Sequence, residues 1–359
     1  MLRMQSAADT VSGSCSEGVM QIVVYAWHSV WSGMYRKYRR CPWLFSGRDG
    51  VPSTREKNRF MSLSFTSFGD FELMPIHCGT FRLDGGAMFG VVPKTLWSRH
   101  IPADEKNRIL MGMRSLLIRS RASGRVYMID NGAGDKFDEK MSRIYGMDLV
   151  SGNLMDSLRM AGVEPGEVTD IIFTHLHFDH CGGTTSLDTE GRLFHNFPNA
   201  TYHVHERHWA TATNPNVREK ASFLKENIEP IADSGRLHLT GDDEVYEEGL
   251  SVQMAEGHTV GQQLPVISGP QSVEGDKQTI VYAGDLIPTH VHIPLPWVMG
   301  YDMRPLVTLR EKEAFLKTCV EERWLLFLEH DAETELIRVG CEDGKYFVSE
   351  TLDLAEVMG

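Results

Sequence analysis

The sequence predicts a mixed α/β (α+β) fold in which layers of strands and helices pack against each other. Two observations indicate this class. Short apolar runs typical of strands recur along the chain, and stretches with helical periodicity alternate with them. The composition, 42% hydrophobic and 24% charged with 33 glycines and 15 prolines, is that of a globular protein with many turns. A chain of 359 residues can bury a large core without disulfides or a structural metal, so any metal is expected to be functional.

The first elements are expected soon after residue 61. Three strands are predicted there, at Phe71–Ile76, Ser115–Ser120 and Val126–Asp130. The third leads into Asn131-Gly132-Ala133-Gly134, whose composition indicates a turn. A helix is predicted over Asn153–Ala161, because its apolar residues recur at three- and four-residue spacing and share one face.

The second half is expected to add strands and a long helix. The apolar run Thr169–Thr174 predicts a buried strand that ends at a cluster of His and Asp. Further strands are predicted at Thr201–Val204, Leu250–Ala255, Thr279–Ala283 and Leu325–Leu328. Thr308 and Glu311 have the spacing of a capping box, which predicts a helix that begins there and runs through Val320.

The charge is unevenly distributed along the chain. The formal net charge is −13, but residues 1–60 carry nine Lys/Arg against four Asp/Glu, which leaves 27 basic and 45 acidic residues, a balance of −18, in the remainder. An acidic surface repels the phosphate backbone, so no nucleic-acid partner is expected. We expect residues 61–359 to form one domain, and residues 1–60 to be either a disordered extension or the product of a misassigned start with Met61 as the native initiator.

Cysteine usage and hydropathy predict a cytoplasmic protein with no membrane partner. The six cysteines are spread singly without a CxxC pair, which indicates neither a thiolate zinc site nor a disulfide framework. The apolar run Ile22–Trp27 falls well short of the ~20 residues that a membrane span needs. The basic residues follow this run instead of preceding it, which argues against a secretory signal.

The segment Thr174–Gly183 is the strongest chemical signal, because it places three histidines and a carboxylate within six residues. His175 and His177 can face one side of an extended segment, whereas Asp179 and His180 turn to a second position. Imidazole and carboxylate groups suit zinc and similar divalent ions, and a site without thiolates keeps an open coordination position. One loop can therefore serve two metals. The two glycines at its end are expected to allow a sharp turn.

This loop resembles the HxHxDH loop of the metallo-β-lactamase superfamily. Three later segments resemble the family's other ligand motifs in the same order, namely Ala255–Thr259, Tyr282–Asp285 and Leu328–Asp331. Each follows a predicted strand, and the resemblance extends from about residue 68 to about residue 330. It implies a four-layer αβ/βα sandwich that binds two divalent metal ions, with zinc expected and manganese, iron or cobalt as alternatives.

The resemblance also implies a set of seven ligands. They are His175, His177 and His258 for one metal, Asp179, His180 and His330 for the other, and Asp285 as a bridge between them. Outside this set, His203, His205 and His208 lack an Asp-His partner motif, so a packed or solvated role is expected for them.

Two cations ~3.5–4 Å apart can share a water, lower its pKa from ~15.7 towards ~7 and hold the bridging hydroxide for attack on an electrophile. Asp179 or Asp285 would then accept and return the proton as catalytic carboxylates. The expected reaction is hydrolysis of an ester, lactone or phosphotriester bond of a small molecule. Two alternatives remain open, a phosphodiesterase or nuclease of the same fold and a non-catalytic metal-binding scaffold.

A segment rich in Pro and aromatic residues follows Asp285 and predicts an apolar wall of a substrate pocket. Its candidate pocket residues are His290, His292, Trp297 and Tyr301, and for the two histidines a structural role is equally expected. The stretch from Gly284 to Ile287 resembles methyl-parathion-hydrolase-like and lactonase-like members of the family. Well-known acyl-homoserine-lactone lactonases have a substrate-contacting Tyr where this chain has Pro288, and Tyr301 or His290 are candidates to replace it. The expected partners are a small-molecule substrate and a second copy of the chain in a homodimer.

Overall fold

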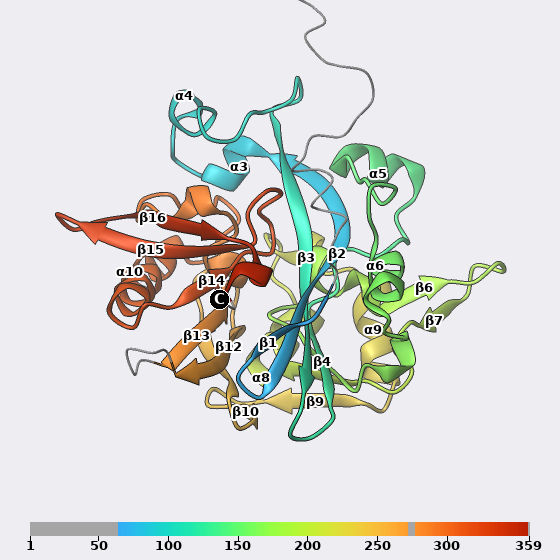
Figure 1. Cartoon of the computed structure of the whole chain (residues 1–359). Coiled ribbons are helices and arrows are strands. Elements are labelled where there is room, and N and C mark those ends of the chain that lie inside the picture. Colours follow the sequence, from blue (N-terminus) through green and yellow to red (C-terminus); the bar gives the residue numbers. More distant parts are fainter. Residues whose placement is uncertain (1–63, 272–276, 358–359) are drawn as a thin grey trace, which may run out of the picture. The chain divides into compact units, whose positions relative to one another are not determined.

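The protein is described by a computed structural model over residues 64–271 and 277–357 (Figure 1). The expected extension over residues 1–60 lies outside the described residues. Two seven-stranded sheets and one two-stranded sheet form the framework of the described part.

The first large sheet combines antiparallel and parallel strands. Its order is β1 (Thr66–Phe68), β2 (Phe71–Asp84), β3 (Arg108–Ser120), β4 (Val126–Ile129), β5 (Asp170–Ile172), β8 (Thr201–His205) and β9 (Leu237–Thr240). Strands β1 to β4 pair antiparallel, whereas β4, β5, β8 and β9 run parallel. The carboxyl ends of the parallel strands therefore meet at one edge.

The second large sheet is antiparallel with one exception. Its order is β10 (Val245–Glu247), β11 (Leu250–Ala255), β12 (Gln262–Gln271), β13 (Lys277–Tyr282), β14 (Leu325–Phe327), β15 (Leu336–Glu342) and β16 (Lys345–Leu352). The exception is the parallel pair β13 and β14, in which Tyr282 lies opposite Phe327. The next residues of both strands therefore emerge on the same side.

The helices and one small hairpin connect these strands. The helices are α3 (Gly85–Phe89), α4 (Lys94–Trp97), α5 (Glu139–Tyr145), α6 (Leu154–Ala161), α7 (Phe178–Cys181), α8 (Glu206–Thr213), α9 (Lys225–Asp233) and α10 (Pro305–Glu321). The hairpin consists of β6 (Thr185–Leu187) and β7 (Leu193–His195). None of the helices in the described ranges has the length and apolar character that a membrane crossing requires.

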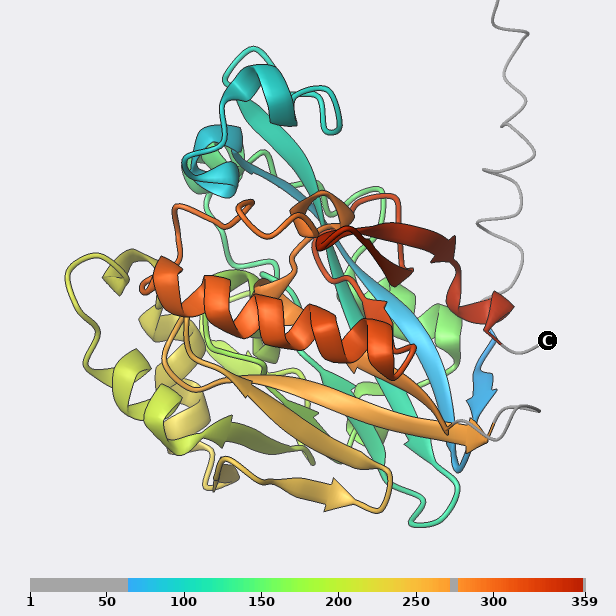
Figure 2. The same ribbon diagram turned by 90° about the vertical axis from the view of Figure 1, so that its left-hand side faces the viewer.

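Three apolar clusters show that the domain has four layers. The middle cluster joins the two sheets, with Phe71 and Ile172 from the first and Tyr282 and Phe327 from the second. The outer face of the first sheet packs against residues of α6 and α9. The outer face of the second sheet packs against α10, which lies across it in Figure 2. The expected four-layer αβ/βα sandwich is confirmed.

The strands expected from the sequence are present, and several are longer than expected. Strands β2 and β3 extend over 14 and 13 residues. Helix α6 also agrees with its prediction. At its start, the Asn153 side chain accepts a hydrogen bond from the backbone N–H of Asp156. Gly162, in the left-handed conformation, ends it.

The predicted start of the long helix is wrong. Helix α10 begins at Pro305, three residues before Thr308, because proline is well suited to the first position of a helix. Glu311 does not cap this helix. Its carboxylate accepts hydrogen bonds from the backbone N–H groups of Glu256 and Gly257, on the loop that leads to His258. Glu311 therefore makes a tertiary contact, and its spacing from Thr308 only resembles that of a capping box.

Candidate metal centre

Four strands deliver the predicted ligand residues to one end of the two sheets. His175 comes three residues after the end of β5, and His258 three residues after the end of β11. Asp285 and His330 come three residues after the ends of β13 and β14, which are parallel neighbours in register. The backbone N–H of Gln263 donates to the carbonyl of Thr174 at 2.8 Å, which joins the two sheets beside the site. All seven predicted ligand residues are buried and lie together.

The first cluster consists of His175, His177, His258 and Asp285, whose ligand atoms all lie within 4.8 Å of one another. Nδ1 of His177 is 3.0 Å from Nε2 of His175 and 3.2 Å from Nε2 of His258. Tetrahedral zinc with Zn–N distances of 2.0–2.1 Å separates two ligand nitrogens by ~3.3 Å. The spacing of these nitrogens therefore fits a shared cation.

The second cluster consists of Asp179, His180 and His330. Nε2 of His180 and Nε2 of His330 lie 3.1 Å apart, again at the spacing of two ligands on one ion. Asp285 stands between the clusters. Its Oδ2 is 3.2 Å from Nε2 of His258, and its Oδ1 is 3.2 Å from Nε2 of His330. Apart from this contact with His330, buried Oδ1 has no hydrogen-bond partner among the described residues, so it is available to a cation.

The outer nitrogens of the histidines are held by other groups of the chain. His177 Nε2 contacts Glu219 Oε1 at 3.2 Å, and His258 Nδ1 contacts Asp302 Oδ1 at 3.1 Å. In the second cluster, Nδ1 of His180 contacts Asp130 Oδ2 at 3.0 Å and Nδ1 of His330 donates to the Gly112 carbonyl at 3.0 Å. An acceptor at the outer nitrogen places the proton there and leaves the inner nitrogen as a ligand.

The electrostatics of the site favour a bound cation. Burial lowers the pKa of His175 well below its usual value, which keeps the imidazole neutral. Burial acts against the charge of Asp285, but facing His258 and His330 hold the pKa of Asp285 well below its usual value. Burial likewise opposes protonation of His330, yet Asp285 raises the pKa of His330 to about 9. A metal ion binding here would displace that proton.

The two glycines after the ligand loop have a different role from the one expected. Gly182 has an ordinary helical φ of −65°, so it makes no special turn. A Cβ on Gly182 would lie 2.0 Å from the carbonyl oxygen of Ala133, and a Cβ on Gly183 would lie 2.2 Å from that of Asn131. Glycine is required because the loop packs directly on the turn that follows β4.

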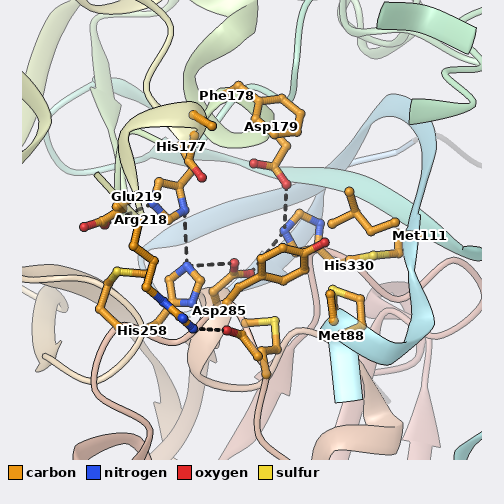
Figure 3. A pocket seen from close by; sticks show the side chains of 18 of the residues that line it. Met88, Met111, His177, Phe178, Asp179, Arg218, Glu219, His258, Asp285 and His330 are labelled. Carbon is orange, nitrogen blue, oxygen red and sulfur yellow. Dashed lines mark hydrogen bonds and ion pairs between the residues drawn. The ribbon is translucent and has the colours of Figure 1, made fainter. Parts of the chain in front are cut away.

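A cavity of about 370 Å³ opens over both clusters (Figure 3). Five ligand residues lie along it, namely His177, Asp179, His258, Asp285 and His330. Its other walls are mainly apolar. They include four methionines, two tyrosines and three polar side chains, namely Met88, Met111, Met299, Met303, Tyr145, Tyr301, Arg218, Glu219 and Ser222. The site therefore combines a polar base with an apolar wall, as small-molecule sites do.

The predicted pocket residues divide into two groups. Tyr301 lines the cavity, whereas His290, His292 and Trp297 are not among its lining residues. His290 pairs through Nδ1 with Asp331 Oδ2 at 2.5 Å.

His292 and Trp297 contact residues of α3 and do not line the cavity themselves. Nε2 of His292 donates to the carbonyl of Met88 at 2.9 Å, and its ring stacks on Phe89 with centroids 4.6 Å apart. Trp297 contacts Phe89 edge to face.

The histidines expected to be packed make ordinary hydrogen bonds. His208 accepts at Nε2 from the backbone N–H of Leu176 at 2.7 Å and donates from Nδ1 to the carbonyl of Val260. His203 pairs with Asp170, and His205 pairs with Asp242. His208 thus fixes the ligand loop from outside both clusters.

Sequence reasoning missed Glu219, Asp302 and Arg218. Glu219 and Arg218 lie in the connection between α8 and α9, and Asp302 lies before α10. None belongs to a motif with regular spacing, so only the contact with a ligand histidine or with the cavity reveals them.

Comparison with known proteins agrees with this geometry. Residues 114–318 match the model of the metallo-beta-lactamase superfamily. A stretch of 122 residues is 30% identical to N-acyl homoserine lactonase AttM of Rhizobium johnstonii and 29% identical to that of Rhizobium radiobacter. Each alignment covers 33% of this chain and 43% of the relative, so the match spans less than half of either relative.

Two solved structures extend the likeness over most of the described fold. A probable metal-dependent hydrolase from Staphylococcus aureus superimposes with a TM-score of 0.69 and 29% identity, covering 80% of this chain and all of that one. The dizinc quorum-quenching lactonase AidC, in complex with a product, superimposes with a TM-score of 0.64 and 22% identity, covering 80% of this chain and 97% of that one. Because the family match covers more than half of the chain and the fold agrees, this protein belongs to the metallo-β-lactamase superfamily.

Proposed function

We propose that this protein is a dinuclear metal-dependent hydrolase that cleaves an ester or lactone bond of a small, partly apolar molecule. The observation that carries the proposal is the position of Asp285, which points one carboxylate oxygen at each histidine cluster at the base of a cavity. Such an arrangement suits two cations that share one ligand.

The residues present fit two divalent metal ions. His175, His177, His258 and Asp285 would hold one, and Asp179, His180 and His330, with the second oxygen of Asp285, would hold the other. When bound, two divalent cations lower the pKa of water and polarise the oxygen of a carbonyl group. The oxygen-rich and nitrogen-rich donor set without thiolates suits zinc or a neighbouring ion.

The remaining side chains orient the substrate and move protons. Asp179 and Asp285 line the cavity and are placed to accept a proton during hydrolysis. Tyr145 and Tyr301 line the same cavity, and neither hydroxyl makes a hydrogen bond to another described residue, so both can donate to a substrate oxygen. Burial raises the pKa of Tyr301 to about 12, which keeps its proton in place at neutral pH. Four methionines offer adaptable apolar contacts to the rest of the substrate.

The likeness to the lactonases AttM and AidC supports lactones as the first substrates to test. A cavity of about 370 Å³ is in the size range of small-molecule sites, which favours a small substrate over a nucleic acid. An open cavity above the ligand residues also favours catalysis over a closed metal-binding scaffold.

The test has two stages. The purified protein is loaded with zinc, manganese or cobalt and its metal content is measured. It is then assayed with a panel of lactones, aryl esters, phosphotriesters and phosphodiesters. His177→Ala is the inactive control, and His238→Ala, whose side chain is 52% exposed and lies outside both clusters, is the matched control.

We expect two metal equivalents and hydrolysis of a lactone or aryl ester, lost in His177→Ala and kept in His238→Ala. Fewer than two equivalents, or equal inactivity of wild type and His177→Ala on every class, would contradict the proposal. Preferred cleavage of a phosphodiester would favour a phosphodiesterase instead.

We further propose that the hydrolase domain is formed by residues 61–359, within which the family match lies. The intact mass of the protein from its native source tests whether residues 1–60 are retained.

A further inference from the structure

One wall of the cavity is formed by residues 216–222, here called the wall segment. It lies between α8 and α9 and contributes Arg218, Glu219, Ala221 and Ser222 to the cavity lining. Figure 3 shows Glu219 beside His177 and Arg218 extending past His258. The wall segment therefore contacts both the substrate space and the surroundings of the first cluster.

We propose that Glu219 is a positioning residue that orients His177 for metal binding and ties the wall segment to the metal centre. This inference rests on the proposed function, because it assumes that the first cluster binds a cation.

The His177 ring is oriented with one nitrogen toward the cluster and the other toward Glu219. Its Nδ1 faces Nε2 of His175 and Nε2 of His258, so Nδ1 is the nitrogen that points into the cluster. Its Nε2, on the other side of the ring, lies 3.2 Å from Glu219 Oε1. An ionised carboxylate only accepts hydrogen bonds, so this contact places the His177 proton on Nε2 and leaves the Nδ1 lone pair for a cation.

The Glu219 carboxylate is itself held in place by hydrogen bonds. Its side chain is buried, with 2% of the residue exposed. Thr259 Oγ1 donates to Oε1, and Asn216 Nδ2 donates to Oε2 at 3.1 Å. Asn216 Oδ1 in turn accepts from the backbone N–H of Glu219 at 3.1 Å. Because Thr259 is the neighbour of His258, one carboxylate joins the loops of two ligands.

The neighbouring residue Arg218 connects the wall segment to His258 through Asp302. Its guanidinium donates to the backbone carbonyls of Gly300 and Asp302. The side chain of Asp302 accepts from Nδ1 of His258 at 3.1 Å. Two adjacent residues of the wall segment thus reach the outer partners of two ligands in the same cluster. A cation that pulls His177 and His258 into place is expected to order the cavity wall as well.

The experiment uses the full chain and measures metal affinity without an activity assay. Zinc and cobalt dissociation constants are obtained by competition with a chromophoric chelator for wild type, Glu219→Ala and Glu219→Gln. The absorption spectrum of the cobalt form reports ligand geometry. Hydrogen exchange over residues 214–224 is followed with and without zinc. The matched control is Glu139→Gln, because that side chain is 92% exposed.

We expect Glu219→Ala to weaken binding of one of two metals by about 10- to 100-fold, the usual effect of removing a partner of a ligand histidine. Glu219→Gln keeps the size and an acceptor oxygen, so a smaller loss is expected, whereas Glu139→Gln should bind like wild type. The cobalt spectrum should change in Glu219→Ala. Zinc should protect residues 214–224 from exchange in wild type, and less so in Glu219→Ala.

The outcomes separate this inference from the proposed function. If wild type binds fewer than two metals, the dinuclear site itself fails. If wild type binds two and both Glu219 variants match its affinities and cobalt spectrum, Glu219 does not position His177 and the inference is overturned. Equal exchange of residues 214–224 with and without zinc would overturn the link to the wall. Should Glu219→Ala not fold, as judged by circular dichroism, the isosteric Glu219→Gln decides.

Discussion

The two clusters of the candidate metal centre differ in what holds them. In the first cluster, the outer nitrogens of His177 and His258 contact Glu219 and Asp302, which lie in segments that line or border the cavity. In the second cluster, the outer nitrogen of His330 contacts the Gly112 carbonyl within β3. His177 and His258 are therefore held by loops that line or border the cavity, whereas His330 is held by a strand.

The same contrast applies to His180. Its Nδ1 contacts Asp130, which directly follows β4. Asp130 also accepts hydrogen bonds from the backbone N–H and the hydroxyl of Thr174, at 2.8 Å and 2.6 Å. It thereby joins the ends of β4 and β5 beneath the ligand loop. The partners of His180 and His330 belong to the sheet framework, whereas the partners of His177 and His258 belong to loops at the cavity. We therefore expect changes behind the second cluster to affect folding, and changes behind the first to affect the cavity.

The largest effect is expected from Asp285→Ala, which removes the residue shared by both clusters. Loss of several kcal/mol of electrostatic stabilisation corresponds to a fall in kcat/KM of at least about 10²-fold. Metal content should drop for both sites, which metal analysis and chelator competition measure. A variant that keeps two metals and near wild-type activity would remove the basis for treating the clusters as one dinuclear site.

The variants Asp130→Asn and Asp302→Asn test whether the two clusters differ in what holds them. Asp130→Asn should lower the free energy of unfolding of the metal-free protein by about 1–3 kcal/mol. Both carboxylate oxygens of Asp130 face buried donors of Thr174 and His180, and an amide replaces one of those acceptors with a donor. Asp302→Asn should leave that stability nearly unchanged and weaken one metal by about 10-fold. Thermal unfolding and metal titration separate the two effects. If both variants changed stability and metal affinity by the same amounts, the two clusters would not differ in what holds them.

Gly182→Ala tests the close contact between the ligand loop and the turn after β4. Its Cβ would lie 2.0 Å from the Ala133 carbonyl oxygen, so overpacking is expected to cost about 1–3 kcal/mol of stability. Gly241→Ala is the matched control, since its Cβ would meet nothing within 4 Å. Chemical denaturation measures both. Equal stability of the two variants would mean that the loop can move away from the turn at no cost.

The smallest effect is expected from Arg218→Met, which keeps the aliphatic stem and removes the hydrogen bonds to the Gly300 and Asp302 carbonyls. Hydrogen bonds contribute about 0.5–1.5 kcal/mol, and these two hold the cavity wall in place. Their loss should weaken substrate binding, so that KM rises by about 2- to 10-fold while kcat changes little. Steady-state kinetics on the best lactone or ester provide the measurement. If kcat fell and KM did not change, Arg218 would act at the reacting bond and not by holding the cavity wall.

The ligand residues could be predicted because the His-rich loop and three later motifs resemble those of the family, and each motif follows a predicted strand. In the structure, His175, His258, Asp285 and His330 come three residues after the last residue of β5, β11, β13 and β14. Apolar strands and His-rich motifs are local patterns, so both can be recognised without knowing how the sheets pack. The four-layer fold was implied by the same motifs through the family resemblance.

What the sequence misjudged or left open depended on long-range contacts. Thr308 and Glu311 have the spacing of a helix cap, but Glu311 instead accepts hydrogen bonds from the backbone N–H groups of residues 256 and 257, directly after β11. For His292 a pocket role and a structural role were equally expected, and the structure places it in a hydrogen bond to the carbonyl of Met88. Spacing along the chain does not reveal which face of a loop meets the cavity.

The sequence alone determined which residue types reach the edge of the sheets and in what order, because strand length and motif spacing are local properties. How those residues are held depends on contacts between distant parts of the chain. Glu219 lies 42 positions from His177, and Asp302 lies 44 positions from His258. The connections between such pairs carry no periodic pattern, so each contact arises only when the sheet has formed and brought two of its loops to the same end.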